Sequence, residues 1–376
     1  MRPRLYYFIP LLIILLGLST VVAQEENTSE TQLACDATIT QLVEVVEQIC
    51  TNLGQDQICY GNTAVDAVPT DDVVDFAFDI PGDFVDLQGV RSLYLSELNL
   101  DDDQWGIAQM RVQANLDTIT PVSVTMLLFG DTSIEAADVS DRAIIPVNVG
   151  VEHNARLRST PSLNALIIDV AASGEMVEAV APLEDNSWLR VRENEFGRVG
   201  WVSASLLDLS TADIDQLTVE DGAQPYFNGM QAITLQTGSA DSCGNTVTNG
   251  LLIQTPQGVA QVTFQINEVV IELQDGGSGS TALLDANPGS GMNLNMLGGS
   301  ARVTVPGNAP VTVNTNQQLS VDLNTDLTPT GAINAPQDVD PVSTPSVAAM
   351  QTTLIPRVNT VTTTYNPTVA TSSTGT

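Results

Sequence analysis

Five arginines and two tryptophans lie close together in the sequence, between residues 154 and 207. An arginine guanidinium presents a planar fork of N–H donors that matches a carboxylate. A tryptophan ring presents a flat apolar face that can hold a peptide or a sugar. The segment therefore predicts a binding site for a carboxylate-bearing ligand, with candidate contacts at Arg156, Arg190, Arg192, Trp188 and Trp201.

The same side chains also have structural interpretations, which the sequence leaves open. The tryptophans could complete a very small hydrophobic core instead of lining a groove. The arginines could pair within their own segment with Glu175, Glu178, Glu184 or Glu193. The residue types alone thus predict where a site would lie, and not whether it is open to a ligand.

Catalysis has few candidates in this chain. His153 is the only histidine and there is no lysine, so a hydrolase of the Ser–His–Asp or Cys–His type would have to use that one imidazole. No Gly-x-Ser-x-Gly motif occurs, and the glycine-rich residues 275–280 lack the lysine of a phosphate-binding loop. We therefore expect neither an enzyme nor a bound cofactor, and keep an envelope hydrolase as the third alternative.

The N-terminus has the order of a secretory signal. Arg2 and Arg4 precede an apolar stretch from Leu5 to Leu18, and Val21-Val22-Ala23 follows as a cleavage site. We expect cleavage near Ala23, which makes residues 1–23 a signal peptide and places the mature chain outside the cell or in the cell envelope. An uncleaved N-terminal anchor is the alternative, because the apolar run is just long enough to span a bilayer.

Four cysteines in an exported chain predict two disulfide bonds. Cys35 and Cys50 flank a helix-like segment and would lie about 22 Å apart, too far for a direct bond. Cys50 and Cys59 close a short loop and are the preferred pair, which leaves Cys35 to pair with Cys243. No Cys-x-x-Cys occurs, so we expect no metal site.

The charge balance excludes some partners. The chain has 12 basic and 45 acidic residues. Without Arg2 and Arg4 the mature chain would carry 10 − 45 = −35 charges. Nucleic acids and anionic lipid surfaces repel such a chain. We expect no nucleic-acid partner and no membrane insertion of the mature chain.

Periodicity divides the rest of the chain. Apolar residues at spacings of three and four predict a helix over residues 38–50, within an N-terminal region of 33–130 that is otherwise rich in alternating strands. Residues 210–326 form a second strand-rich region. Residues 327–376 are rich in Thr, Pro and Ser with almost no aromatic residue, which predicts a disordered tail or stalk.

Residues 151–209 contain an Arg-Ser-x-Pro-Ser opening, a Trp-x-x-Val strand and a closing Gly-Trp-Val-Ser-x-x-Leu. With these motifs the segment resembles the bacterial SH3-like (SH3b) domain. The positions that match are Arg158, Pro161, Gly174, Trp188, Val191, Gly200, Trp201 and Val202. The match of Arg158 implies a structural role for it. The loop after Pro161 is unusually apolar, with Leu163 and residues 165–168. Residues 250–305 weakly resemble the β domain of FecR-type proteins.

The resemblance implies a small binding module. Relatives of this domain often bind cell-wall peptides or other envelope ligands, so we expect a cell-wall peptide or an envelope protein as the partner. A structural or stalk protein with no ligand at the barrel is the alternative. The sequence therefore predicts a mainly β protein, with an SH3-like barrel between two strand-rich regions, one N-terminal helix and a disordered C-terminal tail.

Overall fold

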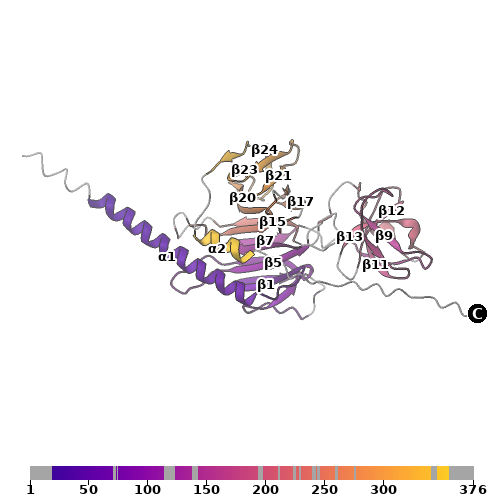
Figure 1. Ribbon diagram of the computed structural model, residues 1–376, viewed down its shortest axis with the longest axis horizontal. Coiled ribbons are helices and arrows are strands. Elements are labelled where there is room, and N and C mark those ends of the chain that lie inside the picture. Colours follow the sequence, from indigo (N-terminus) through magenta and orange to yellow (C-terminus); the bar gives the residue numbers. More distant parts are fainter. Residues whose placement is uncertain are drawn as a thin grey trace, which may run out of the picture.

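The computed structural model describes most of the chain from Ser19 to Leu354. It describes residues 19–354 with gaps at 71–72, 74, 114–122, 138–142, 194–197, 211, 223–225, 228–229, 239–242, 244–245, 259–260, 275–276 and 340–344. Strands are the main regular structure in this part, as the composition predicts, and a larger body and a smaller unit are visible (Figure 1).

Two sheets form the larger body. Among the described residues the first has ten strands: β1 (Gln57–Asn62), β3 (Phe84–Asp86), β5 (Ile107–Gln113), β6 (Ser123–Phe129), β16 (Gly250–Gln254), β19 (Thr281–Asn287), β20 (Gly291–Gly298), β23 (Gln317–Leu323), β24 (Pro329–Ile333) and β25 (Gln337–Asp338). The second has eight: β2 (Val65–Pro69), β4 (Val90–Leu95), β7 (Thr132–Ala136), β15 (Ala232–Thr237), β17 (Gln261–Ile266), β18 (Val269–Gln274), β21 (Ser300–Thr304) and β22 (Val311–Asn314).

Alternation along the strands builds a core on each face of the first sheet. In β6, Val124, Met126 and Leu128 point into the main core between the two sheets, while Leu127 and Phe129 point to the opposite face. Apolar residues on both faces explain why β6 is buried along almost its whole length. The second face therefore needs its own cover.

Two helices cover that second face. α1 (Ser19–Ile49) and α2 (Pro345–Leu354) lie side by side on the ten-stranded sheet (Figure 1). They enclose a second core that includes Ile39, Val43 and Val46 of α1 and the ring pair of Trp105 and Phe129. The helix predicted over residues 38–50 is thus confirmed, and it begins earlier than expected.

Both predicted disulfides join this layer to the sheets. Cys35 in α1 is bonded to Cys243, with 5.9 Å between the Cα atoms, and Cys50 is bonded to Cys59 in β1, with 5.8 Å. The first bond links positions 208 residues apart. The pairing expected from the sequence is confirmed.

The smaller unit is inserted between two strands of the body. Its seven strands are β8 (Ile145–Val149), β9 (Ala155–Arg158), β10 (Ile167–Ala171), β11 (Met176–Pro182), β12 (Trp188–Arg192), β13 (Val199–Ser203) and β14 (Leu207–Asp208). They surround a third core. Among the described residues no pairing joins β10 to β14, so the expected barrel is a curled sheet whose path stays open.

The strand-rich regions on either side of the insertion share both sheets. β6 pairs with β16, and β7 pairs with β15. The N–H of Ala137 donates to the carbonyl of Ala232 at 2.9 Å, so the chain leaves and re-enters the body at one place. Residues 33–130 and 210–326 therefore contribute to one β-sandwich.

The prediction of a disordered tail from Leu327 onward is wrong for the part that the structure describes. Two strands, β24 and β25, extend the ten-stranded sheet beyond that residue, and α2 buries Val347 and Met350 against α1. The tail has too few apolar residues for a core of its own. It is ordered because it adds to an existing sheet edge and an existing apolar surface. The rest of the predicted tail, residues 340–344 and 355–376, lies outside the described residues.

The predicted signal peptide lies mostly outside the described residues as well. Residues 1–18 are not described, and the expected cleavage position at Ala23 falls within α1. No helix among the described residues is both long and apolar enough to cross a bilayer. Export and cleavage stay predictions.

The two disulfides should differ in their contribution to stability. In the loop-entropy description a disulfide that closes 208 residues restricts the unfolded chain more than one that closes 9 residues. The longer loop should stabilise the fold by roughly 5 kcal/mol and the shorter one by roughly 3 kcal/mol. Urea unfolding should therefore show a larger loss in the free energy of unfolding for Cys35→Ser/Cys243→Ser than for Cys50→Ser/Cys59→Ser.

Thiol titration of the unreduced, denatured parent should detect no free cysteine, and reactive thiols would contradict the pairing.

A buried carboxyl group predicts a pH-dependent stability. Burial raises the pKa of Asp285 above its ordinary value of 3.8, and the hydrogen bond that Asn293 donates to it at 2.9 Å opposes this in part. The neutral carboxyl group therefore stabilises the fold fully below that ordinary value, and this stabilisation is lost as the pH rises through the raised pKa.

Replacing Asp285 by asparagine tests this effect. The Asp285→Asn change keeps an acceptor for Asn293 and removes the charge, so it should raise the urea midpoint at neutral pH and lose that advantage near about pH 3. Asp322→Asn, at an exposed position of β23, is the matched control. If the stability of both variants changed equally with pH, the effect would not come from the buried carboxyl group of Asp285.

Candidate functional site

One row of side chains crosses the outer face of the smaller sheet. Val170 in β10 pairs with Arg156 in β9, and Trp188 in β12 pairs with Ser203 in β13. Directly paired residues project to the same side of a sheet, so each pair contributes to one surface. The inward neighbours, such as Leu157 and Val202, belong to the core of the unit.

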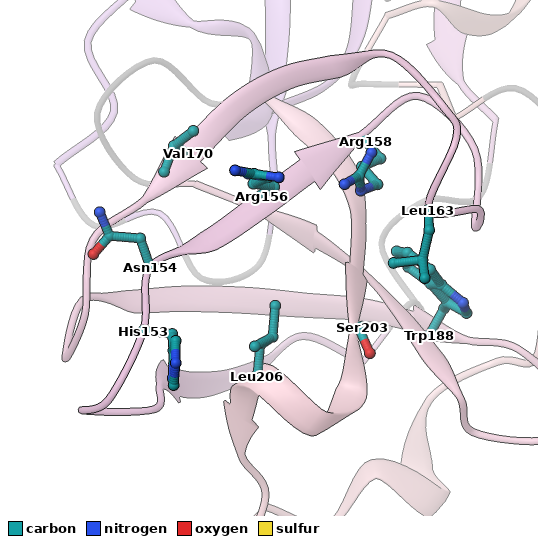
Figure 2. A pocket seen from close by; sticks show the side chains of 9 residues that line it. All are labelled: His153, Asn154, Arg156, Arg158, Leu163, Val170, Trp188, Ser203 and Leu206. Atoms are coloured by element: carbon teal, nitrogen blue, oxygen red, sulfur yellow. The ribbon is translucent and has the colours of Figure 1, made fainter.

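Arg156, Val170, Trp188 and Ser203 line a pocket of about 590 Å³. The rest of the wall comes from Arg158 of β9, the loops before and after that strand, and the short helix η2 (Ala204–Leu206). Figure 2 shows the nine lining side chains, which are His153, Asn154, Arg156, Arg158, Leu163, Val170, Trp188, Ser203 and Leu206. The lining that the structure describes contains no carboxylate, in a chain with 45 acidic residues.

The two arginines of the pocket have different roles. Arg158 is buried, and its Nη1 donates to the carbonyl of Ala165 at 2.8 Å, which holds the apolar loop after β9 against the sheet. Arg156 is exposed, and the structure gives it no ion-pair or hydrogen-bond partner among the residues it describes. Its guanidinium therefore keeps its donors available to a ligand in the pocket.

The predicted contacts at Arg190 and Trp201 lie on the same sheet but outside the pocket. Trp201 is 1% exposed. The guanidinium of Arg190 lies 4.6 Å from the centre of its ring and forms an ion pair with Glu220. These two side chains are packed and paired within the chain.

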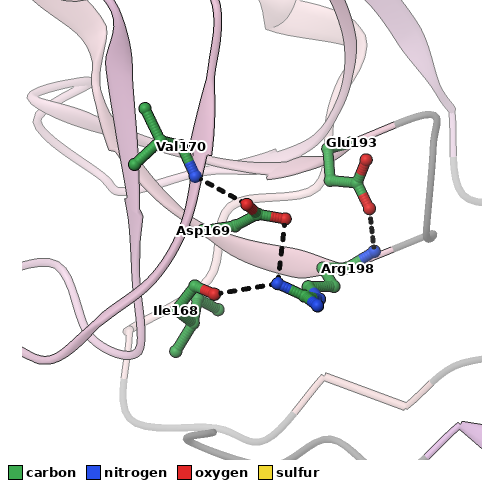
Figure 3. A network of polar contacts seen from close by, with 5 residues as sticks. All are labelled: Ile168, Asp169, Val170, Glu193 and Arg198. Atoms are coloured by element: carbon green, nitrogen blue, oxygen red, sulfur yellow. Dashed lines mark hydrogen bonds and ion pairs between the residues drawn. The ribbon is translucent and has the colours of Figure 1, made fainter. Parts of the chain in front are cut away.

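Arg192 and Arg198 are also paired. Nε of Arg192 donates to Glu178 at 2.7 Å, across the β11–β12 pair. Arg198 lies 3.3 Å from the carboxylate of Asp169 and donates to the carbonyl of Ile168 at 3.2 Å, while its backbone N–H donates to Glu193 (Figure 3). Of the predicted ligand contacts, the structure thus brings only Arg156 and Trp188 together in one pocket.

Sequence reasoning missed most of the pocket wall. His153, Asn154, Leu163, Val170, Ser203 and Leu206 were not candidates. Two signals could have found some of them. A register that pairs the strands on either side of the Arg-Ser-x-Pro-Ser motif puts Val170 beside Arg156. An unusually apolar loop predicts an exposed apolar side chain such as Leu163, which is 75% exposed.

Comparison with known families agrees with this geometry. Residues 153–208 match the family model of the bacterial SH3 domain. This unit is a bacterial SH3 domain. No curated protein and no solved structure matches the chain. The resemblance of residues 250–305 to FecR-type proteins stays a prediction.

The SH3 domain of this chain is larger than the matched segment. β8 precedes residue 153, and Leu217 follows residue 208, yet both contribute to the core of the domain. A bacterial SH3 domain indicates a binding module in general, so the pocket is its candidate site.

The ion pair of Arg190 should matter for stability and that of Arg192 much less. Arg190 is 5% exposed, so Arg190→Gln leaves Glu220 without its charge partner in a mostly buried place, at a cost of about 3 kcal/mol. The pair of Arg192 and Glu178 is more exposed, and Arg192→Gln should cost about 1 kcal/mol or less. Urea unfolding of the two variants, followed by Trp fluorescence, measures the difference; equal losses would contradict it.

Proposed function

We propose that the protein is an exported, non-catalytic binding module of the bacterial cell envelope. Its SH3 pocket takes a peptide that carries a carboxylate, as cell-wall peptides do. The observation that carries the proposal is the exposed guanidinium of Arg156, which has no partner among the described residues and lies in a pocket whose described lining has no acid.

Charge favours an anionic group in the pocket. Acidic residues outnumber basic ones by 45 to 12 in the chain, so a carboxylate partner is easy to find, and Arg190, Arg192, Arg198 and Arg302 each have one. Arg158, Arg190, Arg192 and Arg198 are each bonded to a group of the chain itself. Arg156 is instead surrounded by neutral or basic pocket residues, and a ligand carboxylate would complete its hydrogen bonds.

The pocket also favours an apolar group next to that carboxylate. Arg156 and Asn154 lie toward one side of the view in Figure 2, whereas Leu163 and Trp188 lie toward the other. An exposed leucine beside a half-buried indole is a surface that gains free energy when an aliphatic side chain covers it. A peptide offers both groups at once, and a small inorganic anion does not.

Export is part of the proposal. The signal-like N-terminus and the two disulfides suit an oxidising compartment outside the cytoplasm. There a module for cell-wall peptides would meet its ligand.

A pull-down on purified cell-wall sacculi tests the function. Arg156→Gln should weaken binding by about tenfold, the loss expected for a charge-assisted hydrogen bond, and added salt should weaken binding of the parent, because exposed charges are screened. Arg192→Gln is the matched control, since Arg192 lies outside the pocket lining and is paired with Glu178.

Unchanged binding of the Arg156→Gln variant would overturn the proposal. If that variant keeps its melting temperature and still binds sacculi as the parent does, Arg156 is an ordinary surface charge. The structural or stalk alternative then takes the place of the binding module.

A further inference from the structure

A short segment that follows the matched SH3 residues lies across the domain. We call residues 218–222, together with Tyr226, the strap. The residue before it, Leu217, is 5% exposed and packs into the SH3 core, where it anchors the start of the strap. The backbone N–H of Glu220 donates to the carbonyl of Pro182 at 3.0 Å, and Glu220 forms a parallel β-bridge with Leu183. The strap thus runs beside the end of β11 as an added extended peptide would.

The strap also supplies partners for Arg190. The carboxylate of Glu220 forms an ion pair with the guanidinium, and the ring of Tyr226 has its centre 5.8 Å from it. Trp201 lies 4.6 Å from the same guanidinium. One carboxylate and one aromatic ring of the strap therefore engage a cation that already rests on a tryptophan.

Gly222 lets the strap approach the domain closely. Its φ is +79°, and a Cβ there would lie 2.7 Å from Cγ of Pro161 and 3.1 Å from Cδ2 of Leu183. A residue with a side chain would be strained in this conformation and would collide with Pro161. The path of the strap thus depends on this one glycine.

The surface beneath the strap is continuous with the pocket. Trp201 pairs with both Arg158 and Arg190, which forms a second row across β9, β13 and β12. This row is two residues along each strand from the row of Arg156, Ser203 and Trp188, so the two rows share a face of the sheet. Nε1 of Trp201 is buried with no hydrogen-bond partner among the described residues.

We propose that the row of Arg158, Trp201 and Arg190 is a second peptide-binding surface, which the strap occupies in cis. Its ligands are extended acidic peptides in which a glutamate is followed, two residues later, by a glycine. Among the described residues nothing accepts from the buried indole N–H of Trp201, so an acceptor on a bound peptide would find a donor there. The inference concerns residues other than Arg156 and does not depend on what fills the pocket.

Tethering explains why a ligand must displace the strap. A segment joined by a short linker acts at an effective concentration on the order of millimolar. A free peptide at micromolar concentration cannot compete with it while the strap keeps its contacts. The strap therefore keeps the second surface closed until its own contacts are weakened.

A labelled peptide with the sequence of residues 217–226, added to the full chain, tests the inference. Gly222→Val should release the strap, so the peptide should bind this variant about tenfold or more tightly than the parent. Hydrogen exchange should show new exposure at residues 218–222, and unchanged protection of β9, β12 and β13 and of Leu217 in the core. If the strap is released and the peptide still does not bind, the surface is no peptide site; if those strands lose protection as well, the strap is an integral part of the domain and the proposal is wrong.

A second variant covers the case in which Gly222→Val does not fold. Glu220→Gln keeps the shape of the strap and removes its charge, so the parent peptide should bind this variant, and a peptide with glutamine at the same position should bind it more weakly. Equal binding of the two peptides would show that Arg190 is not the anchor. Binding of sacculi through Arg156 involves no strap residue, so this inference and the proposed function fail separately.

Discussion

The fold depends on strand pairing across the inserted SH3 domain. β6 and β7 precede the insertion and find their partners, β16 and β15, only after it. Closing so long a loop costs conformational entropy, and the third core lets the insertion fold as a unit and shorten the effective loop. The hydrogen bond from Ala137 to Ala232 marks the point where both connections meet. Without this closure the ten-stranded sheet would lose β16 and every later strand, and its second face would lose Cys243 and α2, because all of these follow the insertion.

The same constraint shapes the SH3 surface. After β14 the chain has to return to the body, and it re-enters at Met230 and Gln231, which are fully buried. Part of the return path is the strap, which crosses the face that also carries the pocket. A connection required by the topology thus covers Arg190 and Trp201 and leaves Arg156 and Trp188 accessible. The two rows of one sheet differ in exposure because of where the chain must go, and not because of their residue types.

Local signals predicted the parts of this fold that depend on neighbours in sequence. Three features depend only on residues close in sequence: the helix at residues 38–50, the SH3 motifs and the Cys50–Cys59 loop. The second disulfide followed by elimination. Alternation shows that residues 122–128 form a strand, yet it cannot say that Phe129 pairs with Gly250. The ordering of Val347 and Met350 likewise depends on an apolar surface made by α1, far away in sequence. Contacts between residues far apart in sequence settle such questions. Whether Arg190 is paired within the chain, for example, depends on the carboxylate of Glu220.

The arginines show how an acidic chain can keep a cation available. Where 45 carboxylates accompany 12 guanidinium groups, a pairing partner is easy to find, and Arg190, Arg192 and Arg198 have found one. Arg156 differs in its neighbours on the adjacent strands. Val170 of β10 lies on one side and Ser203 of β13 on the other, and neither side chain can form an ion pair. A free guanidinium at an exposed site costs little, since water solvates it. The guanidinium of Arg156 is available because the strand register places these two residues beside it. A single change of Val170 or Ser203 to an acid would supply an ion-pair partner within the chain and remove that availability.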